Sequence, residues 1–280
     1  MSSYTSENPS DTILPLKEIP GSYGLPFLGP IQDREVAYKE IIPTFEISVS
    51  RLFTDLEAEL SDKGEANFNA ISDKMSFDLL FLLFANTSSY DTECCRRCSA
   101  KLCRNRWIGF APAASWGAIV AEEGGVTLAG INKMSLAKSV VWEALRIEPP
   151  VTSQYGKAKD DITITSHDAS YIIKKGEVIF GYQPIATKDP KIFVNPEEFV
   201  PDRFVGDGEK LIKYVYWSNG RETDDPTTKN KQCPGKDMVV LLSRLMLVEF
   251  FRRYDTFNVE VGMLLLGSSV TFKSLTKTEI

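Results

Sequence analysis

Cys233 has neighbours that suit a reactive thiolate. The segment 230–245, NKQCPGKDMVVLLSRL, places it ahead of a Pro-Gly pair and a long apolar run that predicts a helix. A thiolate is stabilised near a helix N-terminus by unpaired backbone N–H groups and the helix dipole. Gly235 lets the backbone approach a flat ligand, and Lys231 supplies a nearby cation. A haem with an axial thiolate needs these parts, although an inert buried thiol fits Cys233 alone equally well.

Two charged motifs precede this segment. Glu143 and Arg146, in WEALR, are three residues apart on one face of a predicted helix, where they can pair. Taken alone, the pair fits an ordinary surface ion pair, which stabilises little. A segment with three prolines, residues 188–204, follows and ends in PDRF, which contains Arg203. We predict that this segment is an irregular meander.

The order ExxR, PDRF and Cys-Pro-Gly resembles the cytochrome P-450 superfamily. The resemblance implies a haem-thiolate fold that is mainly α with small β sheets. It also implies that Glu143, Arg146 and Arg203 form a network beneath haem b. In the same way, Cys233 would be the axial ligand of the iron, and Lys231 and Gly235 would contact the cofactor.

An insertion, RETDDPTTKNKQ, separates Gly220 from Cys233. Residues 13–34 and 135–280 are similar to the plant branch of this superfamily that metabolises fatty-acid hydroperoxides. The similarity is carried by this insertion and by the segments IPGSYGLPFLGPIQDR and SLAKSVVWEALRIEPPVTSQYGKAK. That branch contains allene oxide synthases, hydroperoxide lyases and divinyl ether synthases. The resemblance implies a fatty-acid hydroperoxide substrate, which brings its own O–O bond, so neither oxygen nor a reductase is needed.

The segment LLFLLFANTSSY resembles the family's helix across the haem, where an asparagine holds the hydroperoxide. This places Asn86 in a catalytic role, although Ser88 and Ser89 stand where the family has glycines. A polar residue near a helix end fits Asn86 as well. A conventional monooxygenase is disfavoured by the long insertion and by the lack of an acid-alcohol pair near Asn86.

The resemblance is interrupted, first after Arg34 and again near Phe77, because the family has a longer chain. We therefore expect one incomplete haem-thiolate domain over residues 1–280, best supported over 135–280. The leading hypothesis is an allene oxide synthase-like dehydratase. Hydroperoxide lyase and divinyl ether synthase stay open, and a truncated, catalytically inactive paralogue is the alternative of another class.

Hydrophobic periodicity gives the elements that must position these residues. We predict helices over residues 42–63, 70–90, 131–150 and 235–257. Pro43 is expected in the first helical turn, Gly64 as a C-terminal stop, and Pro149-Pro150 as the end of the third helix. Strands are predicted within 160–182, with His167 in a hairpin loop, and one or two more within 263–276.

Composition narrows the partners and the compartment. A net charge of −6 argues against nucleic-acid binding. The polar start of the chain fits neither a secretory signal nor a transit peptide, and no stretch is apolar for long enough to span a bilayer. We expect a cytoplasmic protein or one peripherally associated with a membrane. Cys95-Arg-Arg-Cys98 lacks the second half of a zinc site, so we interpret the cluster of Cys94, Cys95, Cys98 and Cys103 as thiols in a surface loop.

Overall fold

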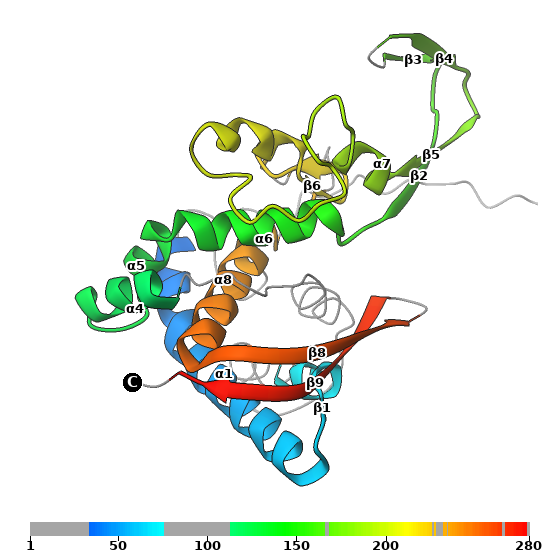
Figure 1. The fold of residues 1–280 in the computed structure, drawn as a ribbon. Coiled ribbons are helices and arrows are strands. Elements are labelled where there is room, and N and C mark those ends of the chain that lie inside the picture. The colour runs from blue at the N-terminus through cyan, green and yellow to red at the C-terminus, as the bar shows by residue number, and fades with distance from the viewer. Residues whose placement is uncertain are drawn as a thin grey trace, which may run out of the picture.

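The computed structural model describes residues 34–75, 113–165, 168–225, 227, 232–233, 235–264 and 267–278. It is mainly helical with small antiparallel sheets, as predicted (Figure 1). The labelled α-helices are α1 (Arg34–Lys63), α4 (Ala113–Glu122), α5 (Leu128–Lys133), α6 (Ser135–Ile147), α7 (Gln183–Thr187) and α8 (Lys236–Arg253), and η2 (Gly206–Tyr214) is a 3₁₀ helix. The strands are β1 (Ala66–Asn67), β2 (Ser153–Lys157), β3 (Ile162–Thr165), β4 (Ser170–Ile173), β5 (Val178–Tyr182), β6 (Tyr216–Trp217), β7 (Gly220–Arg221), β8 (Tyr254–Leu264) and β9 (Gly267–Lys277).

A first hydrophobic core lies between α1, α4, α6, α8 and the β8–β9 hairpin. Phe45, Val49, Leu52 and Leu56 recur at threes and fours along α1, so one face of this helix is buried in the core. Phe250 of α8 packs its ring against several aromatic neighbours. This core fixes α8 and therefore the direction in which its N-terminus points.

A second core lies on the other side of α6. Val141, Trp142 and Leu145 of α6 face it, and Phe193 and Phe204 of the meander pack onto them. Cys233 also packs against this cluster. Because α6 contributes to both cores, it joins the helical body to the segment that carries the cysteine.

Four small sheets complete the described part of the chain. β9 lies between β1 and β8, and all the pairings are antiparallel. β2 pairs with β5, and β3 pairs with β4. In Figure 1, β3 and β4 lie at the tip of an arm that β2 and β5 carry away from the helices.

The first predicted helix is longer than expected. It begins at Arg34, so the prediction that Pro43 lies in a first turn is wrong, and Pro43 lies inside α1. A proline there removes one backbone hydrogen bond, and burial of Ile41, Ile42 and Phe45 around it opposes that cost. The predicted stop is confirmed: Gly64 has φ +72°, and its N–H donates to the Leu60 carbonyl at 2.9 Å.

The third predicted helix is divided in two. α5 ends and α6 begins at Met134, whose φ of −90° and ψ of 71° are not helical. Met134 is buried in the first core, so packing compensates for the break in the helix. The end before the two prolines is confirmed, since α6 ends at Ile147.

The last predicted helix is too long, because α8 ends at Arg253 and β8 begins at Tyr254. Tyr254 is fully buried and pairs with β9, and this tertiary pairing overrides the local helical pattern. The β3–β4 hairpin is confirmed, whereas β2 was not predicted. Residues 68–75 are helical, but the rest of the predicted 70–90 helix and His167 lie outside the described residues.

Candidate functional site

Glu143 and Arg146 form a two-pronged ion pair on α6. Arg146 Nε donates to Glu143 Oε2 at 2.7 Å, and Nη2 donates to Oε1 at 2.8 Å. Both side chains are 0 % exposed, so this is not a surface ion pair. A buried pair costs much desolvation unless its remaining hydrogen-bonding atoms are also satisfied.

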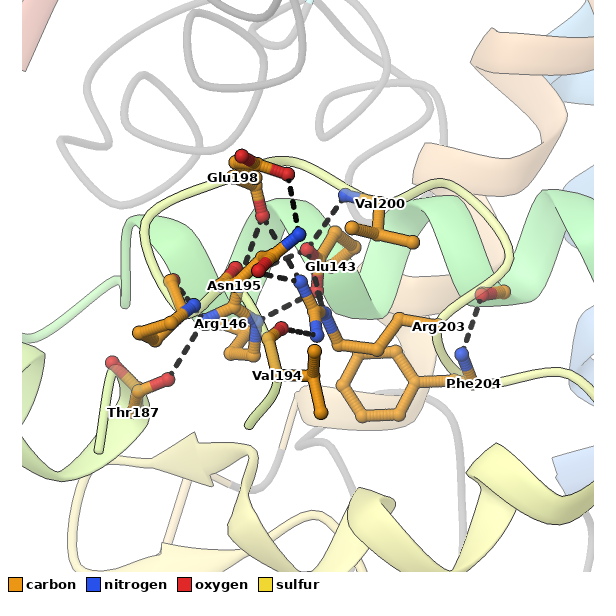
Figure 2. A network of polar contacts seen from close by, with 11 residues as sticks. Glu143, Arg146, Thr187, Val194, Asn195, Glu198, Val200, Arg203 and Phe204 are labelled. Atoms are coloured by element: carbon orange, nitrogen blue, oxygen red, sulfur yellow. Dashed lines mark hydrogen bonds and ion pairs between the residues drawn. The ribbon is translucent and has the colours of Figure 1, made fainter. Parts of the chain in front are cut away.

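Arg203 brings a second guanidinium to the same carboxylate (Figure 2). Its Nε lies 2.9 Å and 3.0 Å from the two oxygens of Glu143, and its side chain is 6 % exposed. The backbone N–H of Val200 also donates to Glu143 Oε1, at 2.9 Å. One carboxylate therefore holds α6 to the end of the meander.

Backbone carbonyls of the meander region accept the remaining donors of both arginines. They compensate the excess positive charge of two guanidiniums against one carboxylate. Arg146 donates to the carbonyls of Thr187, Pro196 and Glu198, and Arg203 donates to those of Val194, Asn195 and Glu198, at distances of 2.6–3.1 Å. Asn195 has φ +47°, a left-handed conformation that asparagine tolerates. The irregular backbone of this segment is thus fixed by side chains.

Two further residues belong to this network, and the sequence reasoning missed them. Ser139 Oγ accepts the backbone N–H of Phe204 at 3.0 Å, and the Phe193 ring lies 4.9 Å from the Arg146 guanidinium carbon. Ser139 precedes Glu143 by four residues and Arg146 by seven, so the three share one helix face. That spacing was the available signal for Ser139, whereas nothing in the sequence points to Phe193.

Cys233 lies just before α8, as a half-buried thiol. Its carbonyl accepts the N–H of Lys236, in the first turn of the helix, at 3.3 Å. Gly235 is the N-cap residue, so the helix begins without a side-chain cap. Among the described residues, the one atom within 4 Å of a methyl group placed at Gly235 is the Cys233 sulfur, at 3.9 Å. The glycine thus leaves space beside the sulfur that any other side chain would fill.

These features fit a thiolate-ligated haem. A sulfur that is partly exposed, soft and close to a helix N-terminus is a suitable axial ligand, and open backbone beside it accommodates a flat ring. Cys233 and the Glu143 network border the same hydrophobic core, so packing connects the two. Lys231 and Asn86 lie outside the described residues, as does the cluster of Cys94, Cys95, Cys98 and Cys103.

Buried and half-buried charged side chains also lie before and along α8, and the sequence reasoning did not anticipate them. Burial raises the pKa of Glu222 and lowers that of Lys138. Arg244 is 4 % exposed, and burial lowers its pKa to about 10. Arg244 donates to the Ile131 carbonyl and to Asn132 Oδ1, so it joins α8 to α5.

Two other properties concern the described part of the chain. No three His, Cys, Asp or Glu side chains within it gather as a metal-binding cluster. None of its helices has the length and apolar character needed to cross a bilayer.

Comparison with known proteins identifies relatives. The cytochrome P450 family matches residues 117–261, just over half of the chain. Allene oxide synthase 3 of Solanum lycopersicum is 41 % identical over 339 residues, which cover 86 % of this chain and 69 % of the relative. A chloroplastic allene oxide synthase of Arabidopsis thaliana is 36 % identical over 378 residues, covering 95 % of this chain and 73 % of the relative. A divinyl ether synthase of Solanum tuberosum is 64 % identical over 160 residues, covering 57 % of this chain and 34 % of the relative.

The lengths of these matches confirm that internal segments are missing. The alignments run over 339 and 378 positions, more than the 280 residues of the chain, so the relatives carry segments within the aligned region that this chain lacks. The match to the divinyl ether synthase covers only about a third of that relative. The chain belongs to the cytochrome P450 family, in the group that contains the plant allene oxide synthases and divinyl ether synthases, and it is shorter than these relatives.

Proposed function

We propose that this chain is a haem-thiolate lyase that dehydrates polyunsaturated fatty-acid hydroperoxides to allene oxides in oxylipin biosynthesis. The observation that carries the proposal is Cys233, half-buried before α8 beside the open backbone of Gly235, in a chain of this family. The substrate class comes from the relatives, several of which are named allene oxide synthases. Because a hydroperoxide carries its own O–O bond, the reaction needs neither molecular oxygen nor a reductase.

The proposal gives each candidate residue a separate role. Cys233 would ligate the iron, Gly235 would leave room for the ring, and Lys231 would neutralise a propionate. Haem b, when bound, would supply an electron-rich iron at which the O–O bond of the substrate is split. Glu143, Arg146 and Arg203 do not act on the substrate: they hold the meander that packs with Cys233 on the second core.

Asn86 would orient the substrate by hydrogen bonding to the hydroperoxide group. An amide offers both a donor and an acceptor, so it can hold a peroxide without supplying or removing a proton itself. The product formed from the substrate would then depend on residues around the fatty-acid chain. We place the whole reaction in one haem-thiolate domain, of which 135–280 is the best supported part.

The test is reconstitution with haem. The purified chain should bind added hemin and give a thiolate-type spectrum, and Cys233→Ser should abolish this spectrum while leaving far-UV circular dichroism unchanged. Ser243→Ala, on α8 and away from the cysteine, serves as the control. A wild-type chain that holds no haem would refute the enzymatic proposal and favour a truncated, inactive paralogue.

Analysis of the reaction products distinguishes allene oxide synthase activity from divinyl ether synthase and hydroperoxide lyase activity. The 64 % identity to a divinyl ether synthase keeps that activity as a second candidate, although an allene oxide synthase of Parthenium argentatum reaches 63 %. Incubation with 9- and 13-hydroperoxides should yield allene oxide hydrolysis products. Divinyl ethers would establish the second candidate, and short-chain aldehydes would establish a hydroperoxide lyase.

A further inference from the structure

The long loop before Cys233 is closed at its base. Ser218 and Gln232 form an isolated antiparallel bridge, and Gln232 Nε2 donates to the Arg221 carbonyl. Gly220 lies against Gln232 so closely that a methyl group there would come within 2.9 Å of three Gln232 side-chain carbons. The two ends of the insertion therefore meet, and the residue before Cys233 is held by the β6–β7 hairpin.

Glu222, just after β7, makes three hydrogen bonds at the base of this loop. Its N–H donates to the Val215 carbonyl at 2.7 Å, and its carboxylate accepts the indole N–H of Trp217. Its own carbonyl accepts Lys236 Nζ at 3.0 Å. Burial raises the pKa of Glu222, and the nearby Lys236 charge opposes part of that shift.

The third contact reaches the first turn of α8. Lys236 is 6 % exposed, and a buried ammonium is costly unless polar groups surround it. Its Nζ is bound by the Glu222 carbonyl and by Asp237 Oδ1 at 2.8 Å, while its N–H donates to the Cys233 carbonyl. Since α8 has no side-chain N-cap, these bonds connect the loop base to the turn that contains the cysteine.

We propose that Glu222 is a positioning residue for Cys233: anchored on Trp217, it holds Lys236 and thereby the backbone that aims the thiol. The effect of Glu222 on catalysis rests on the proposed role of Cys233 as the iron ligand, whereas the positioning of Cys233 by Glu222 does not. The contacts themselves are made by residues of the chain alone. The described base of the insertion then holds the turn that contains the cysteine.

The first test needs no haem. Iodoacetamide modification of Cys233, followed by mass spectrometry of its peptide at fixed pH, reports how accessible the half-buried thiol is. Glu222→Ala should raise the rate about tenfold, as expected for loss of one hydrogen bond to a charged acceptor. Trp217→Phe should raise it in the same direction, while Glu222→Gln, which keeps an acceptor for the indole, should restore a rate near that of the wild type.

Glu209→Ala is the matched control, because Glu209 is an exposed glutamate in η2, before the same hairpin. Equal modification rates in Glu222→Ala and Glu209→Ala, at equal thermal midpoints, would overturn the proposal. If Glu222→Ala fails to fold, the comparison of Trp217→Phe with wild type decides the question: an unchanged rate overturns the proposal and a raised rate supports it.

The second test uses the haem-loaded chain. The fraction of ferrous–CO complex with a thiolate-type band should fall in Glu222→Ala and recover in Glu222→Gln. An unchanged fraction in Glu222→Ala would show that the contacts of Glu222 with Trp217 and Lys236 do not affect ligation by Cys233. If the wild type binds no haem, the proposed function fails, and the modification rates still decide whether Glu222 positions Cys233.

Discussion

At the scale of single residues, Glu143 is the carboxylate that the two buried arginines of the described network share. Its carboxylate accepts hydrogen bonds from Arg146, Arg203 and the backbone of Val200. Both arginines are almost fully buried, so each depends on this charge for compensation. Loss of the carboxylate therefore leaves two cations in the interior, which is far worse than loss of a packed side chain.

Glu143→Ala should reduce the free energy of unfolding by about 3–5 kcal/mol, or prevent folding. Urea unfolding followed by circular dichroism measures the change. Glu65→Ala removes an exposed glutamate that pairs with Lys273 at 2.5 Å, and it should leave the urea midpoint nearly unchanged. Similar midpoints for the two variants would contradict the role assigned to Glu143.

At the scale of elements, α1 and α8 show packing prevailing over local preference. Pro43 remains inside α1 because the helix buries apolar residues on both sides of it. Tyr254 leaves the helical pattern of α8 because its ring is buried and its backbone pairs with β9. In both places the sequence predicted a helix but not the residue at which that helix starts or ends.

Pro43→Ala should stabilise the protein, by up to about 3 kcal/mol, since it restores a backbone donor within the helix. The ring of Pro43 is exposed, so little packing is lost. A rise in the thermal midpoint is the expected result. Ala58→Gly, farther along α1, is a control with the opposite expected sign. It should lower the thermal midpoint, because glycine inside a helix is less stable than alanine. A midpoint that falls in Pro43→Ala would show that the proline stabilises the helix.

At the scale of the whole molecule, the β2–β5 arm exposes large apolar side chains. Tyr155 and Phe180 are cross-strand partners that are 84 % and 65 % exposed, and Val178 and Ile172 are each 66 % exposed. Apolar surface of this kind favours association. The chain lacks internal segments that its relatives carry, so its surface need not be the one that the relatives present to solvent.

We expect the chain to self-associate through this arm. The double variant Tyr155→Glu/Phe180→Lys should shift the sedimentation profile toward monomer, because opposite charges preserve the strand pair while removing its apolar surface. Lys159→Glu/Asp160→Lys, on the exposed turn after β2, is the control that exchanges two exposed charges and leaves the apolar surface in place. A wild-type monomer at high concentration, or equal effects of both variants, would contradict this expectation.

The sequence by itself determined the order of the charged motifs, the α8 start behind Cys233 and the β3–β4 hairpin. Such features depend on local periodicity, on proline and glycine, and on spacing. Only the tertiary structure decided that one carboxylate serves two arginines, that α5 and α6 separate at Met134, and that Glu222 meets Lys236 across the long loop. Each of these features depends on burial, because burial determines how much free energy an unpaired charge or an interrupted helix costs. The burial of a residue depends on the whole fold and cannot be read from a local sequence pattern.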